Sequence, residues 1–205
     1  MDLYEAMRTT PATREFADDP LPGDVVARVL DHARFAASGR NAQPWRVIVV
    51  RDEATKRFIS EVSQGAFKEY VAQLGLDREP FSASDDGVWR EPAIDLEAAR
   101  TRDDLPHFGA IESCAALLVV CADLSKLAFL DALLDRQSFI GGASVYPFVQ
   151  NVLLGLRNEG FGGVPITFVC REEPRICERL GIPRPWAIAC TVAAGKPARR
   201  ITRLK

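Results

Sequence analysis

The sequence predicts a protein that contains both helices and strands, with a central sheet covered by helices. Four short apolar runs carry the strand signal, and segments with helical spacing separate them. On this pattern alone the alternation would favour a parallel α/β sheet, but the pattern does not fix the direction of any strand. No linker or internal repeat divides the chain, and its length suffices for a sizeable core. Residues 1–205 are therefore expected to form one domain.

The first half of the chain begins with a predicted helix and strand. Residues 24–37 place Val25, Val29 and other apolar side chains on one face at helical spacing. The β-branched run at residues 45–51 is typical of a buried strand. Residues 53–74 have mixed polarity and predict a second helix.

An irregular, lid-like segment is expected at about residues 75–110. It contains three prolines, three glycines, many acidic residues and little periodicity. Long segments of this kind are commonly functional lids or mobile loops. Phe81, Trp89 and Phe108 could cover a flat ligand or could form a satellite hydrophobic cluster, and both interpretations remain open.

The second half of the chain carries the remaining strands and helices. The run at 143–159 is apolar on nearly all sides, which predicts a central buried helix. Strands are predicted at 115–122, 164–170 and 186–195, and helices near 123–134, at 143–159 and at 172–181.

Composition and charge exclude several classes of protein. The formal net charge of -2 argues against bulk electrostatic binding to nucleic acid or to an anionic membrane. No apolar run approaches the roughly 18 residues of a membrane helix, and the N-terminus lacks the pattern of a signal peptide. The expected compartment is therefore the cytoplasm.

The cysteines and histidines do not predict a metal site. The five cysteines contain no C-x-x-C pair, so they are interpreted as small buried apolar side chains. His32 and His107 lie far apart without an acidic ligand pattern between them.

Gly160-Phe161-Gly162-Gly163 is a glycine-rich run that follows a predicted helix and precedes a predicted strand. A dinucleotide-binding fingerprint requires the reverse order, from strand through glycines to helix. The glycines could instead cap the helix and turn the chain, or could allow backbone to approach a flat ligand closely. Both interpretations remain open.

Polar and basic residues gather in three further places. The loop from Ser38 to Trp45 is rich in small polar groups and lies between a helix and a strand. The stretches Arg8–Phe16 and Arg199–Lys205 are rich in arginine and lysine. Together the two ends of the chain could neutralise one phosphate group.

These segments, in this order, resemble the nitroreductase family. Arg14-Glu15-Phe16 resembles the end of the family's R-x-x-R-x-F segment, and Asn41-Ala42-Gln43-Pro44-Trp45 resembles its N-x-Q-P-W loop. The run from Gln150-Asn151 to Gly162 resembles a family helix, and Arg203-Leu204-Lys205 resembles a basic pair near the end of the core. The resemblance covers residues 7–51 and 140–205 well, and 75–110 poorly.

The resemblance implies an α+β fold, with a mostly antiparallel sheet flanked by helices, in a homodimer. It implies FMN at the dimer interface, with NADH or NADPH as electron donor and a nitroaromatic, quinone or related small aromatic molecule as acceptor. The chemistry would be ping-pong, with no obligatory catalytic side chain because hydride moves between stacked rings.

The resemblance also implies roles for individual residues. Arg14 would lie near N1 and the C2 carbonyl of FMN, where a fixed cation favours the reduced state. Arg8, Arg203 and Lys205 would bind the phosphate, with Thr9 and Thr10 from the same N-terminal stretch. The remaining residues that would contact FMN are Ser38, Gly39, Asn41 and Gln43 in the polar loop, and Gly163, Val164, Pro165, Ile166 and Thr167 by their backbone.

Three alternatives to this activity remain. Thr10-Pro11-Ala12 departs from the family's R-R-S and so removes a cation and a hydroxyl from the expected phosphate site. This departure favours a relative that binds or sequesters flavin without turnover. The other two alternatives are a flavin-modifying enzyme and a reductive dehalogenase on the same fold.

Overall fold

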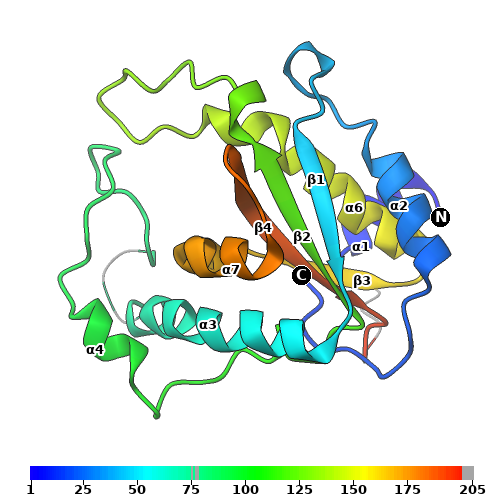
Figure 1. The fold of residues 1–205 in the computed structure, drawn as a ribbon, viewed down its shortest axis with the longest axis horizontal. Coiled ribbons are helices and arrows are strands. Elements are labelled where there is room, and N and C mark those ends of the chain that lie inside the picture. The colour runs from blue at the N-terminus through cyan, green and yellow to red at the C-terminus, as the bar shows by residue number, and fades with distance from the viewer. Residues whose placement is uncertain (75, 77–78, 200–205) are drawn as a thin grey trace.

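The computed structural model describes residues 1–74, 76 and 79–199. It contains a four-stranded antiparallel sheet with strand order β1-β2-β4-β3 (Figure 1). The expected α+β fold is confirmed, and the parallel sheet suggested by the pattern alone is wrong. The strands are β1 (Trp45–Val50), β2 (Ala116–Asp123), β3 (Gly162–Ile166) and β4 (Trp186–Gly195).

Helices cover both faces of this sheet. In Figure 1, α2 and α6 lie on one side of the strands, while α3 and α7 lie on the other. Two buried apolar clusters correspond to these two layers, one on each face of the sheet. The α-helices are α1 (Leu3–Thr9), α2 (Gly23–Ala33), α3 (Glu53–Ala72), α4 (Leu96–Arg100), α5 (Ala110–Ser113), α6 (Tyr146–Asn158) and α7 (Glu173–Leu180).

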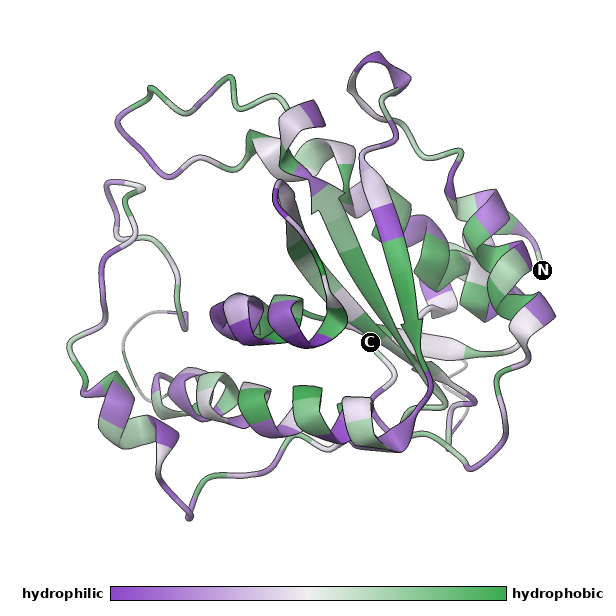
Figure 2. Ribbon diagram, in the orientation of Figure 1, coloured by the Kyte–Doolittle hydropathy of each residue, from purple (hydrophilic) through white to green (hydrophobic). Residues whose placement is uncertain are grey.

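The two helical layers explain why β2, one of the two central strands, is apolar from Ala116 to Ala122. All eight residues of β2 are buried. Leu118 and Val120 belong to the cluster beneath α2 and α6, whereas Leu117 and Val119 belong to the cluster beneath α3 and α7. Unbroken apolar runs are usual in parallel sheets because both faces are covered, and this antiparallel sheet meets the same condition. Figure 2 shows the hydrophobic colour along β1 and β2.

The helix expected near 123–134 is wrong. The chain forms only a short 3-10 turn at Leu124–Lys126 and then an irregular segment. The carboxylate of Asp131 accepts hydrogen bonds from the backbone N–H groups of Phe139 and Ile140 and pairs with Arg136. These bonds hold the pKa of Asp131 well below its usual range. A side chain that binds backbone in this way stabilises a loop in competition with a helix.

Two other boundaries differ from those expected. The strand expected at 164–170 ends at Ile166, and a 3-10 helix, η4 (Phe168–Glu172), follows because the N–H of Cys170 donates to the carbonyl of Thr167. The helix expected at 143–159 begins at Tyr146, with Pro147 in its first turn, after a 3-10 turn at Ile140–Ser144. Proline favours the first turn of a helix because it lacks a backbone N–H.

The segment at about 75–110 is largely irregular in its described residues, apart from α4 and the start of α5. In Figure 1 it forms an extended loop beyond α3. Among the residues that the structure describes, none of the helices combines the length and apolar character of a membrane span.

Candidate functional site

A cleft of about 720 Å³ opens between α3, the end of β3 and the irregular 75–110 segment. Ligand pockets for small molecules and cofactors commonly measure about 300–1,000 Å³. The cleft is lined by Arg14, by Val164 to Phe168 with Cys170 and Arg171, by Phe67 and Tyr70 of α3, and by Pro80, Phe81, Trp89 and Phe108 of the irregular segment.

Arg14 reaches this cleft because the N-terminal segment runs along the outer edge of β3. The N–H of Thr13 donates to the carbonyl of Gly163, 3.0 Å away. The N–H of Ala17 donates to the carbonyl of Lys196 at 2.8 Å, just beyond β4. Arg14 therefore lies between two backbone anchors, and the two ends of the chain run side by side there.

Gly162 permits this close contact between the N-terminal segment and β3. A Cβ atom at this position would overlap the hydroxyl of Thr13 and crowd Pro197. Gly160, at φ +82°, makes the turn between α6 and β3. The structure thus supports the cap-and-turn interpretation of the glycine run.

The outer edge of β3 is covered by the N-terminal segment at Gly163 and is free of that segment further along the strand. β3 is an edge strand, and the carbonyl of Gly163 faces away from β4, toward Thr13. Because backbone groups alternate in direction along a strand, the carbonyl of Pro165 and the N–H of Thr167, just past the end of β3, face the same side, whereas the carbonyl of Thr167 accepts from Cys170. Pro165 has no N–H, so Thr167 supplies the next donor on this edge.

The expected phosphate-binding residues of α1 lie outside the described lining of the cleft. The hydroxyl of Thr10 donates to the carbonyl of Ala6 at 2.6 Å, and that of Thr9 donates to the carbonyl of Glu5 at 2.7 Å. Arg8 is exposed in the last turn of the helix. Arg157, which the sequence reasoning did not single out, donates from α6 to the hydroxyl of Thr9. Arg203 and Lys205 lie outside the described residues.

The polar loop at residues 38–43 lies at the other edge of the sheet. It leads into β1, whereas the cleft lies beside β3, and these are the two edge strands. The structure therefore does not bring Ser38, Gly39, Asn41 or Gln43 to the described cleft. The side chain of Gln43 donates to the carbonyl of Arg34, and its N–H donates to the hydroxyl of Ser38.

This loop holds three non-glycine residues in the left-handed region. Arg40, Asn41 and Gln43 have φ values of 56°, 53° and 44°. Such residues are uncommon, and they are concentrated at binding sites because surrounding contacts must maintain them. Asn41 is exposed, so its side chain remains accessible to a ligand or to another protein chain.

An aromatic cluster forms the inner wall of the cleft. The rings of Phe67, Phe108 and Phe168 contact one another with centroid separations of 4.9 to 5.5 Å. Phe81 and Trp89 complete the aromatic lining from the irregular segment. Both interpretations of that segment therefore apply, since its aromatic residues form a cluster and also line the cleft.

Four other lining residues had no role in the sequence reasoning, namely Phe67, Tyr70, Cys170 and Arg171. The i, i+3 spacing of Phe67 and Tyr70 predicts that they share one face of a helix. The sequence does not show that this face lines a cleft. Burial raises the pKa of the Cys170 thiol to about 11, and the Glu173 carboxylate acts in the same direction. This thiol is therefore protonated at neutral pH and is a poor nucleophile.

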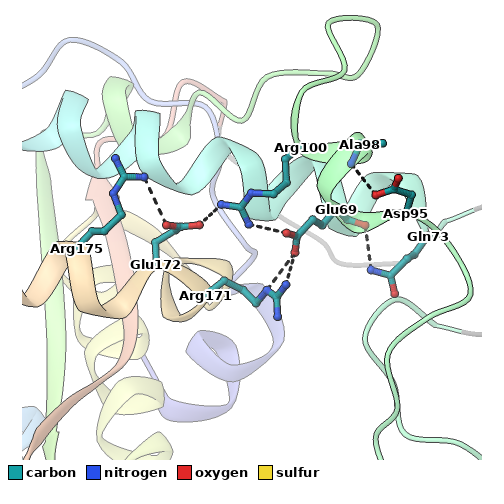
Figure 3. Close-up of polar contacts among 8 residues, drawn as sticks. All are labelled: Glu69, Gln73, Asp95, Ala98, Arg100, Arg171, Glu172 and Arg175. Carbon is teal, nitrogen blue, oxygen red and sulfur yellow. Dashed lines mark hydrogen bonds and ion pairs between the residues drawn. The ribbon is translucent and has the colours of Figure 1, made fainter.

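A group of ion pairs behind the cleft wall joins α3, α4 and η4 (Figure 3). Glu69 is 1% exposed and accepts from Arg100 at 2.5 Å and from Arg171 at 2.8 Å. Arg100 also pairs with Glu172, which lies 3.6 Å from Arg175. Hydrogen bonds to Glu172 and Glu69 raise the pKa of Arg100. This ion-pair network, Glu69–Arg100–Glu172 with Arg171 and Arg175, fixes the backbone of η4 beside the cleft.

A model of the nitroreductase family matches residues 7–196, nearly the whole chain. The chain belongs to the nitroreductase family. It is 30% identical to a protein named NADH dehydrogenase from Thermus thermophilus, over 97% of this chain and 88% of that one. It is 25% identical to chloronitrobenzene nitroreductase from Comamonas testosteroni, over 95% and 85% of the two chains.

The fold agrees with this assignment. A solved structure of an oxidized iodotyrosine deiodinase bound to FMN and 3-iodo-L-tyrosine superposes with a TM-score of 0.70. The match covers 100% of this nitroreductase-family chain and 94% of the deiodinase, at 20% identity. At this identity the likeness concerns the fold alone.

Proposed function

We propose that this nitroreductase-family protein binds FMN in the cleft beside β3, accepts hydride from NADH or NADPH, and reduces a small aromatic acceptor. The observation that carries this proposal is a single cleft that combines aromatic walls, the cation of Arg14 and the open backbone edge of β3. When bound, FMN would supply the hydride chemistry.

The cleft suits a planar ring system that gains negative charge. Its volume of about 720 Å³ is in the range of a cofactor site, and its walls carry five aromatic rings from phenylalanine and tryptophan. Arg14 supplies a positive charge from a backbone held at Thr13 and Ala17. A fixed cation favours an anionic, reduced ring because no reorganisation is needed when the charge develops. The N–H of Thr167 would donate a hydrogen bond at the edge of such a ring.

We further propose that the protein functions as a homodimer. The irregular segment after β2 exposes large apolar side chains, with Leu130 86%, Leu133 98% and Phe139 69% exposed. Large apolar side chains exposed together on one segment favour a protein interface. Dimerisation could also bring the 38–43 loop of one chain to the cleft of another, and the position of the two at opposite edges of the same sheet supports this arrangement.

Reductive dehalogenation is the second candidate function. The iodotyrosine deiodinase whose fold this protein shares is described with FMN and a halogenated aromatic amino acid. Both reactions would use the same cleft and the same cation at Arg14, so the acceptor distinguishes them. Binding of flavin without turnover is the third candidate, favoured by the departure at Thr10-Pro11-Ala12.

The visible spectrum of the purified protein tests these proposals. We expect a yellow protein whose flavin absorbance is bleached by NADH or NADPH without oxygen, and is restored by a nitroaromatic or quinone. Arg14→Ala should slow bleaching roughly ten- to hundredfold, which corresponds to the loss of one charge-assisted hydrogen bond. Colour without bleaching would indicate a flavin carrier, and release of iodide from iodotyrosine would indicate a dehalogenase.

A further inference from the structure

The cleft carries a positive charge, at Arg171, that the flavin chemistry does not require. Two arginines, Arg14 and Arg171, are among the lining residues, and the described lining contains no acidic side chain. Arg14 has a role in the proposed function. Arg171 lies on η4, further along the chain from the β3 edge, and its side chain is 41% exposed.

The ion-pair network pairs Arg171 with a buried carboxylate and leaves its guanidinium at the cleft. It contains three guanidinium groups and two carboxylates, Glu69 and Glu172, so its formal charge is +1 (Figure 3). The carboxylates are buried, at 1% and 8% side-chain exposure, whereas Arg171 is accessible from the cleft. The network therefore keeps its carboxylates inside the protein and holds the guanidinium of Arg171 at the cleft.

The geometry of Arg171 leaves part of its guanidinium available. Its Nε and Nη2 atoms both bind the same oxygen of Glu69, at 3.0 and 2.8 Å. Within the part of the chain that the structure describes, Nη1 makes no hydrogen bond. The guanidinium also lies over the ring of Phe81, 5.3 Å from its centroid. Its orientation is thus fixed on one side by a buried carboxylate and on another by an aromatic ring.

We propose that Arg171 forms an anion-binding subsite, and that the preferred acceptor is an aromatic molecule that carries a carboxylate or another negatively charged group. The ring would pack among the aromatic walls, and the anion would accept hydrogen bonds from Nη1 of Arg171. Arginine suits this role because its planar group donates to carboxylates with defined geometry. The inference rests on the proposed function, since it names the substrate class of the same cleft.

The test compares benzoate with benzamide, which have similar shape but differ in charge. Their affinities for the purified protein would be measured by calorimetry, with and without added FMN. We expect benzoate to bind at least about tenfold more tightly, as charge-assisted hydrogen bonds contribute roughly ten- to hundredfold. Arg171→Gln should bring the two affinities to within about twofold, whereas Arg171→Lys, which retains a cation, should keep part of the preference.

Arg175→Gln is the matched control. Arg175 belongs to the same ion-pair network and carries the same charge, but it is 60% exposed and is not among the described lining residues of the cleft. This variant should leave the preference for benzoate unchanged. Equal loss in both variants would overturn the proposal, because it would show a general effect of charge rather than a subsite.

Other outcomes of this experiment distinguish a failure of the proposed subsite from a failure of the proposed function. A wild-type protein that binds benzoate and benzamide equally would overturn the subsite whatever the variants show. If Arg171→Gln raised the KM of NADPH but not that of NADH, and left benzoate binding unchanged, Arg171 would serve the electron donor and the proposal would be wrong. A preference for benzoate that depends on Arg171, in a protein that binds no flavin, would support the subsite and contradict only the proposed function.

Salt dependence decides the question if Arg171→Gln does not fold. In the wild-type protein, the preference for benzoate should weaken between about 20 mM and about 500 mM salt, because ions screen a partly exposed charge. The affinity for benzamide should change little. A preference that does not respond to salt would contradict an electrostatic subsite.

Discussion

Replacement of Glu69 by glutamine should destabilise the protein strongly. Glu69 is 1% exposed and receives hydrogen bonds from Arg100 at 2.5 Å and from Arg171 at 3.0 Å. Glutamine has nearly the same shape but no charge, so the variant would leave three arginines and one carboxylate, that of Glu172, in the network, and Arg171 would lose its carboxylate partner. The loss of stability should be greatest where α3, α4 and η4 meet, since the ion-pair network connects these three elements.

The expected decrease in the free energy of unfolding depends on how deeply Glu69 and its arginine partners are buried. Removal of one partner from a fully buried ion pair costs about 3–5 kcal/mol. Arg100 and Arg171 are 24% and 41% exposed, so water would solvate part of their charge in the variant. We therefore take the lower end, about 3 kcal/mol. For a chain of this size, 1 kcal/mol corresponds to about 2–4 °C in Tm, which gives a decrease of roughly 6–12 °C.

Thermal and guanidinium chloride unfolding, followed by circular dichroism at one protein concentration, would measure this loss. Glu61→Gln is the matched control because it makes the same change in the same helix at an exposed position, where substitutions usually change stability by less than about 0.5 kcal/mol. The difference should persist at high salt, since buried pairs are screened weakly. If Glu69→Gln unfolded within about 1 kcal/mol of the control, the ion-pair network would not stabilise the fold as argued.

Three further predictions concern the interface, the phosphate and the thiols. Leu133→Asp should lower the dimer fraction measured by light scattering, because Leu133 is 98% exposed on the proposed interface, and a monomeric wild type would refute the dimer. Removal of residues 203–205 should weaken binding of FMN but not of riboflavin, which lacks the phosphate, and unchanged FMN affinity would exclude Arg203 and Lys205 from the site. Burial raises the pKa of Cys170 to about 11, so at pH 8 a thiol reagent should label it much more slowly in the native than in the unfolded protein, and labelling of the native protein should increase as the pH approaches that value. Rapid labelling of native Cys170 at pH 8 would contradict this.

The sequence predicted the elements whose signal is local. The β-branched run before Arg51 and the amphipathic helix at α2 lie within a few residues of their predicted bounds. The direction of the strands could not be predicted from local sequence. A strand such as β2, covered on both faces, has the same apolar pattern in a parallel and in an antiparallel sheet. Only the family resemblance gave the antiparallel arrangement. The loop around Asp131 was missed because one carboxylate organises backbone groups up to nine residues away.

The residues of the candidate site also fall into a group that the sequence predicted and a group that it did not. Motifs identified Arg14 and the backbone from Val164 to Thr167, and the structure brings these together in one cleft. Phe67 and Arg171 could not be assigned to it, since α3 and η4 meet there only through tertiary packing and through the buried side chain of Glu69. The FMN contacts predicted for Ser38, Gly39, Asn41 and Gln43 stay predictions, as do the cytoplasmic location and the phosphate contacts of Arg8, Thr9 and Thr10.

The net charge of this chain is negative, whereas the charged side chains that line the cleft are positive. The chain carries a formal charge of -2, which argues against bulk attraction of anions. Burial of Glu69 and Glu172 nevertheless separates their charges from the surface, while the arginines that pair with them remain partly exposed. A small anionic molecule near the cleft would therefore meet two guanidinium groups at close range, and the acidic surface elsewhere would be screened by salt over about 10 Å. Selection of the acceptor by charge would then depend on which member of each ion pair, the carboxylate or the guanidinium, is buried. The total charge of the chain does not reveal this.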